Sequence, residues 1–148
     1  MDENIGTMLA QVSRLMRRSF DERARAIGVT RPQWQVLSIL RRNAGINQGG
    51  LAEILEVEPI TAGRMIDRLQ EAGLVERRPD PADRRAWRLH LTGKGEELLE
   101  KLQPFVSETF KVALEGIGEE EQAELLAVLA RIRTNLSRRT QIGVVVDG

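Results

Sequence analysis

The sequence lacks cysteine entirely and contains a single histidine, His90. Without cysteine, the chain has no disulfide, no thiolate metal ligand, no thiol nucleophile and no cysteine-based redox sensor. One histidine also argues against a histidine-based metal site and against a serine–histidine–aspartate triad. The carboxylates fall on solvent-like helical faces, without a nucleophile–base pair. We therefore expect a protein that is not an enzyme and that needs no metal or cofactor.

Long apolar runs are also missing, since none approaches the roughly 20 residues that span a bilayer. The first residues, MDENIGTM, are acidic and polar, unlike the basic start and apolar centre of a secretory signal. Of the 148 residues, 41% are hydrophobic and 30% are charged, which is the composition of an ordinary folded protein. We expect a cytoplasmic chain with no membrane partner, built as one domain with appended helices.

An excess of either charge is absent as well, because 22 basic side chains balance 22 acidic ones. The charges are nevertheless unevenly placed along the chain. Residues 84–94 contain four cations and no acid, whereas residues 96–124 contain nine glutamates and two lysines. This distribution suggests that only one end of the molecule binds a polyanion such as nucleic acid.

Apolar residues recur at three- and four-residue steps over most of the chain, a spacing that predicts helices. The spacing predicts an amphipathic helix over 5–27 and a second helix over 30–42, which starts with a capping-box pattern. A short helix follows over 47–55, and a tight connection leads to a fourth helix that Pro59 opens and Gly73 ends. This order is the helix-turn-helix arrangement, whose second helix fits a DNA major groove about 12 Å wide.

Two short alternating segments, 74–78 and 86–91, predict strands, and the residues between them have the composition of a turn. They form a hairpin, or wing, directly after the fourth helix. A long helix to about Ile117 and a last helix after Gly118 complete the chain. The predicted fold is therefore mainly α with a small β-hairpin wing.

The domain organisation follows from this order. We assign residues 30–91 to a winged helix-turn-helix core that binds DNA. The segments 5–27 and 92–139 carry apolar stripes, which packing across a two-fold axis between two copies would bury. An intrachain helical hairpin is the alternative. We expect a homodimer through these helices, with residues 140–148 as a flexible tail.

The periodicity of the fourth helix decides which face it offers to DNA. If its apolar residues face inward, Thr61, Gly63, Arg64 and Arg68 face outward. Arg64 can bond bidentately to guanine, and Gly63 would allow a close backbone approach. A charged helix face is more often simply solvated, but the hairpin that follows carries further cations, and an arginine at a wing tip can enter the narrow minor groove. The cations at and behind the hairpin tip are Arg84, Arg85 and Arg88.

The stretch LAEILEVEPITAGRMIDRLQEAGLVERRPDPADRRAWRLHLTGKG resembles the MarR family of bacterial regulators, especially its SlyA branch. The resemblance extends from the first helix to about Arg139. Its most specific parts are RLQEAGLVERR, the wing sequence DRR at 83–85 and LTGKG at 91–95. Residues 49–50 and 59–60 depart from the commoner pattern of the family.

The resemblance implies roles for individual residues. It implies that Arg64 contacts a base in the major groove, that Arg85 enters the minor groove, and that Asp83 orients the wing through ion pairing. Family members often bind small aromatic or phenolic anions between the dimer helices and the winged core. Arg17 and Trp34 are our candidates for such a pocket. The alternative for Arg17 is a surface ion pair, and the alternative for Trp34 is plain core packing.

The sequence thus predicts a homodimeric transcriptional regulator on a pseudo-palindromic duplex operator, released by a small aromatic anion. Half-sites are expected about 34 Å apart. Two other classes stay open, namely a winged-helix module that binds protein and a small enzyme. The arginines of the fourth helix and the wing argue against the first, and the lack of converging carboxylates argues against the second.

Overall fold

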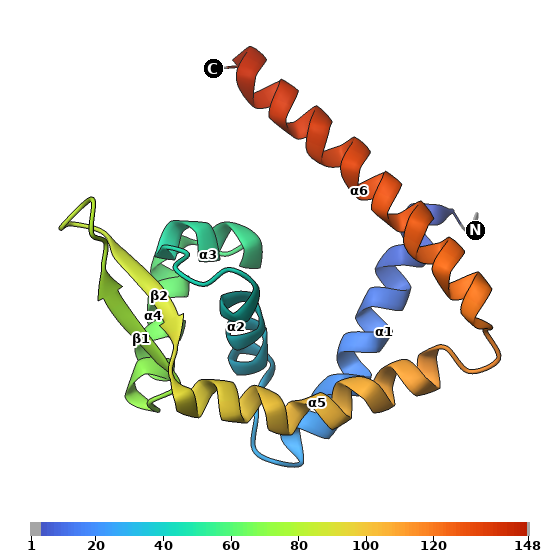
Figure 1. Ribbon diagram of the computed structural model, residues 1–148, viewed down its shortest axis with the longest axis horizontal. Helices are drawn as coiled ribbons and strands as arrows, with labels where there is room; N and C mark the ends of the chain where they lie inside the picture. Colours follow the sequence, from blue (N-terminus) through green and yellow to red (C-terminus); the bar gives the residue numbers. More distant parts are fainter. Residues whose placement is uncertain (1–3, 148) are drawn as a thin grey trace. The chain divides into compact units, whose positions relative to one another are not determined.

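The computed structural model describes the backbone of residues 4–147 and the side chains of residues 4–138. It confirms a mainly helical protein with a two-stranded antiparallel hairpin (Figure 1). The chain divides into two compact units, residues 1–111 and 112–148, and the first contains the predicted winged helix-turn-helix. In chain order the elements are α1 (Ile5–Arg25), α2 (Arg31–Arg42), α3 (Gln48–Leu55), α4 (Pro59–Glu71), β1 (Val75–Pro79), β2 (Trp87–Leu91), α5 (Gly93–Ala113) and α6 (Glu119–Asp147).

Side-chain caps start α2 and α3 where the sequence predicted them. Thr30 and Gln33 form the reciprocal capping box of α2. The Asn47 side chain accepts the N–H of Gly50 at 2.7 Å and so caps α3. A Cβ on Gly50 would lie 2.8 Å from Cγ1 of Ile46, so the glycine relieves crowding at this start. The glycine pair therefore does not prevent α3 from beginning at Gln48.

The hydrophobic core of the first unit lies among the C-terminal part of α1, the helices α2, α3, α4 and α5, and the hairpin. Burying an aliphatic side chain of this size contributes about 1.5–3 kcal/mol relative to leaving it exposed. The core therefore fixes α4 against its neighbours in the winged unit. Its fully buried large side chains are Val36, Leu37, Leu40, Leu51, Ile66, Val75, Leu89 and Leu102.

Backbone hydrogen bonds join the second strand of the hairpin to the rest of the winged unit. Val75 lies opposite Leu91 in an antiparallel register, with each strand beginning one residue later than predicted. The loop between α2 and α3 pairs with β2, because Gly45 N–H donates to Leu89 O at 3.0 Å and Leu89 N–H donates to Ile46 O at 2.9 Å. The base of the wing is thereby hydrogen-bonded to the helix-turn-helix.

The start of α5 is fixed against the C-terminal end of α4. Thr92 Oγ1 donates to the carbonyl oxygen of Gly73 at 2.6 Å, and Lys94 Nζ donates to the C-cap carbonyl of α4 at 2.9 Å. A Cβ on Gly95 would lie only 2.2 Å from the carbonyl oxygen of Leu74. The LTGKG motif thus has a structural explanation, since α5 approaches the backbone after α4 so closely that only glycine fits.

The second unit contains the end of α5 and all of α6. α5 ends at Ala113, earlier than predicted, and the chain turns at Gly116 with a φ of 80°. Glutamates in the first turn of α6 lie at the positive end of the helix dipole. We predicted a flexible tail over 140–148. In the structure the backbone of α6 continues to Asp147. A single glycine, Gly143, does not end the helix, because it costs only about 1 kcal/mol relative to alanine. The side chains of 139–148 lie outside the described residues, so the flexibility of this segment stays a prediction.

No helix in the described part of the chain combines the length and the apolar character that crossing a membrane requires.

Gly95→Ala tests the close approach of α5 to the end of α4. We expect the free energy of unfolding to fall by about 1–3 kcal/mol, because the new methyl group would collide with a backbone carbonyl. Gly93→Ala is the matched control, since a Cβ there meets nothing within 4 Å, and its effect should stay within about 0.5 kcal/mol. Urea denaturation measures both, and equal effects of the two substitutions would contradict the packing described.

Candidate nucleic-acid interface

The two faces of α4 differ in burial as the periodicity predicted. Ala62, Ile66 and Leu69 are buried on the inner face. The outer residues are spaced by three and then four positions, so they share one stripe of the helix. Their exposure agrees with the predicted DNA-facing side, and their contact with bases stays a prediction. These exposed residues are Thr61, Arg64 and Arg68.

Gly63 does not face outward, and this prediction was wrong. Gly63 is buried, and a Cβ there would lie 2.8 Å from Nε2 of Gln48 at the start of α3. Gln48 Nε2 also donates to the carbonyl oxygen of Pro59 at 2.8 Å. The missing side chain therefore allows α3 and α4 to approach each other, rather than allowing α4 to approach DNA. Gln48 joins the two helices, a role that the sequence pattern did not reveal.

Arg77 in β1 binds α4 at three points. Its Nη2 lies 2.7 Å from Oδ1 of Asp67, its Nη1 donates to Oε1 of Gln70 at 2.6 Å, and Nη2 lies 3.4 Å from the carbonyl oxygen of Gly63. Sequence reasoning missed this residue. A signal was present, because alternate strand residues share a face and Arg77 lies on the face of the buried Val75. An arginine on the inward face of a strand needs a partner.

Asp80 organises the wing tip from the end of β1. Its carboxylate accepts the N–H of Ala82 at 2.8 Å and forms an ion pair with Arg88, with Nε and Oδ2 3.1 Å apart. The Ala82 N–H and the Arg88 guanidinium hold the pKa of Asp80 below its ordinary value. The ionised carboxylate is therefore favoured, and Arg88 supports the wing, while its contact with DNA stays a prediction.

Asp83 has a different role from the one that the family resemblance implied. Its Oδ1 accepts the backbone N–H of Arg85 at 3.0 Å, and the described residues provide it with no ion pair. Asp83 therefore shapes the tip through a turn of the backbone. The ion pair that orients the wing belongs to Asp80 and Arg88.

Four arginines of α4 and the wing have no internal anion. All four are exposed, and within residues 4–138 their guanidinium groups form neither an ion pair nor a hydrogen bond. The other arginines of the hairpin, at 77, 78 and 88, are each paired with a carboxylate. The unpaired cations of this interface are Arg64, Arg68, Arg84 and Arg85.

Known proteins share this arrangement. A sequence model of the MarR family matches residues 29–87, from the start of α2 to β2. The structure of the transcriptional regulator SlyA is 29% identical, with a TM-score of 0.76, and the match covers 92% of this chain and 96% of that one. A MarR transcriptional regulator from Methanosarcina mazei Go1 is 27% identical, with a TM-score of 0.78 and coverages of 90% and 96%. A MarR variant from E. coli, solved in complex with operator DNA, is 28% identical, with a TM-score of 0.72 and coverages of 86% and 92%.

The winged core of the chain, residues 29–87, matches the MarR family model, and the chain shares the fold of the solved MarR and SlyA structures. Members of the MarR family are transcription regulators and not enzymes, so the winged core described above is that of a transcriptional regulator. The family resemblance of the sequence and the predicted winged helix-turn-helix fold are both confirmed.

The chain also contains a cavity of about 210 Å³ within its first unit. The cavity lies between α1, α2 and α5, and both predicted pocket residues line it. Its wall is mainly apolar, with cations from two helices. Whether it binds a ligand stays a prediction. The lining residues are Met16, Arg17, Phe20, Trp34, Ser38, Arg42, Val106, Thr109 and Phe110.

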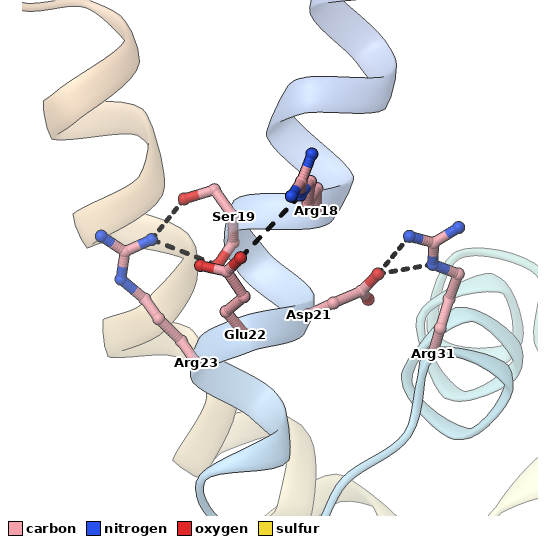
Figure 2. A network of polar contacts seen from close by, with 6 residues as sticks. All are labelled: Arg18, Ser19, Asp21, Glu22, Arg23 and Arg31. Atoms are coloured by element: carbon pink, nitrogen blue, oxygen red, sulfur yellow. Dashed lines mark hydrogen bonds and ion pairs between the residues drawn. The ribbon is translucent and has the colours of Figure 1, made fainter.

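A buried carboxylate holds one wall of this cavity in place. Trp34 Nε1 donates to Oδ1 of Asp21 at 2.7 Å, and the Trp34 ring meets Phe20 edge-on with centroids 4.7 Å apart. Asp21 also pairs with Arg31, as Figure 2 shows, while other α1 side chains in that view bond within the helix. Trp34 is therefore both a packed residue and a cavity residue. Asp21 ties α1 to the start of α2.

Proposed function

We propose that this regulator binds a pseudo-palindromic operator as a homodimer, with α4 in the major groove and the wing in the adjacent minor groove. The observation that carries the proposal is the set of four exposed arginines that lack an internal anion. Phosphates and base edges supply the acceptors that these guanidinium groups lack. The operator complex of the related E. coli protein supports the same partner.

The two arginine pairs have different tasks in this proposal. Arg64 lies in the N-terminal half of α4, the part with which recognition helices contact base edges. Its planar fork matches guanine O6 and N7. Arg85 lies at the wing tip, where a narrow minor groove attracts cations through its negative potential. Arg68 lies further along α4 and Arg84 beside the tip, so both would contact phosphates.

The dimer is proposed from the exposed face of α1. Five large apolar side chains repeat there at three- and four-residue steps and are 40–71% exposed. A stripe of this kind is unusual on a monomer and is typical of an interface. A second copy of the chain is the proposed occupant, because a two-fold axis would place the same stripe on both partners. The residues of the stripe are Ile5, Met8, Leu9, Val12 and Leu15.

An effector is proposed for the cavity between α1, α2 and α5. A small aromatic anion would pair with Arg17 and lie against Trp34. α5 lines the cavity with Val106 and Thr109, and its first turn contacts the end of α4 through Gly95. A ligand that prefers one position of α5 would therefore shift the position of α4 and change operator affinity.

Selection of operator sequences separates the two arginines. Arg64→Ala should cost roughly 1–3 kcal/mol of binding and relax the preference at one position per half-site. Arg85→Ala should weaken binding with little change in the consensus, and Arg85→Lys should recover part of the affinity. The measurement is binding to a duplex library at fixed salt. If Arg85→Ala changed the selected consensus sequence and Arg64→Ala did not, the proposed placement of α4 in the major groove and the wing in the minor groove would be contradicted.

Removing residues 1–27 should yield a monomer or an aggregate, because the stripe of α1 would be lost from both partners. Val12→Glu should have the same effect on the whole chain, because a charge would lie in the apolar interface, and Gln11→Glu, at an exposed neighbouring position, is its control. Sedimentation equilibrium measures the mass. A soluble dimer that survives both the deletion and Val12→Glu would exclude α1 from the interface.

Ligand control predicts saturable quenching of Trp34 fluorescence by hydroxybenzoates, together with a loss of operator affinity. Trp87→Phe leaves Trp34 as the only tryptophan and should keep the response, whereas Arg17→Ala should weaken it because the anion loses its cation. Fluorescence titration and operator binding are measured on the same samples. If operator affinity stayed constant with every hydroxybenzoate tested, control of this regulator by aromatic acids would be excluded.

A further inference from the structure

The first turn of α4 carries an exposed apolar side chain that the fold does not use. Ile60 is 66% exposed, more than any other large apolar residue of α2, α3 and α4. An apolar residue near a helix start often packs as a hydrophobic staple, but the staple position here is Val57, which is half-buried against the core. Ile60 therefore has no packing role among the residues that the structure describes.

The position of Ile60 relates it to the arginines of the same helix. Ile60, Arg64 and Arg68 follow at steps of four, so they form one row along the outer face of α4. Successive members of the row are about 6 Å apart along the helix axis. Ile60 comes first in the row, at the N-terminal end that reaches base edges in recognition helices.

We propose that Ile60 is a specificity-determining residue that contacts the 5-methyl group of a thymine in the major groove. Thymine is the base that presents an apolar group there, and apolar side chains recognise it by burying that methyl group. The thymine lies within about two base pairs of the base that Arg64 reads, given a rise of about 3.4 Å per base pair. This inference rests on the proposed function, because it requires α4 in the major groove.

The test removes one methyl group from the DNA and, separately, the side chain from the protein. The selected operator should contain a thymine at the stated position, and its replacement by uracil should weaken wild-type binding roughly three- to tenfold, since each buried methyl-sized group matters by about this factor. Replacing thymine by uracil should not change the operator affinity of Ile60→Ala. In Ile60→Val the same replacement should cause part of the loss seen with the wild type. A second pair of operators carries either 5-methylcytosine or unmodified cytosine in place of the thymine. The wild type should bind the methylated operator more tightly than the unmethylated one, and Ile60→Ala should bind the two equally.

Ile54→Ala is the matched control, since Ile54 is a 49% exposed isoleucine on α3. It should keep the full difference between thymine and uracil. The inference would be overturned if the wild type bound its operator specifically but the ratio of affinities for the thymine and uracil operators were the same in Ile60→Ala. That result would leave the proposed function intact. Absence of any sequence-specific binding by the wild type would overturn both.

Discussion

The guanidinium group of Arg77 connects the two parts of the molecule that the proposed DNA contact requires. It reaches from β1 to Asp67 and Gln70 on α4 and approaches the carbonyl oxygen of Gly63. Because one planar group binds several points on a helix, it restricts rotation of the wing as well as its distance from α4. The orientation of Arg85 relative to Arg64 therefore depends on this contact.

Close approaches at two glycines hold α4 from its other sides. Gly63 leaves room for Gln48 of α3 at the N-terminal half, and Gly95 brings α5 against the carbonyl oxygen of Leu74 after the C-terminal end. α4 is therefore fixed by α3, β1 and α5, and its outer row is left open to solvent. The proposed effector control would reach α4 through this contact between α5 and the backbone after α4.

Periodicity and capping patterns were enough to predict the order of the elements, the capping box of α2 and the outer position of Arg64. The errors arose where a side chain is decided by its partner in space. Gly63 lies at the edge of the inner stripe, where spacing alone cannot tell a solvent contact from contact with Gln48. Asp80 and Asp83 have similar positions in the turn sequence, and only the register of β2 shows that Arg88 reaches Asp80. The role of Arg77 was not predicted, because its partners Asp67 and Gln70 lie on another element, α4.

A thermodynamic cycle on operator binding tests most directly whether Arg77 makes the wing and α4 one DNA-reading unit. The cost of Arg85→Ala is measured in the wild type, in Arg77→Ala and in Arg78→Ala. Among the described residues, Arg78 pairs only with Glu76 of its own strand. We expect Arg85→Ala to cost less in the Arg77→Ala background, by a coupling of about 0.5–3 kcal/mol. The cost in the Arg78→Ala background should equal that of the wild type. An equal cost of Arg85→Ala in all three backgrounds would contradict the account.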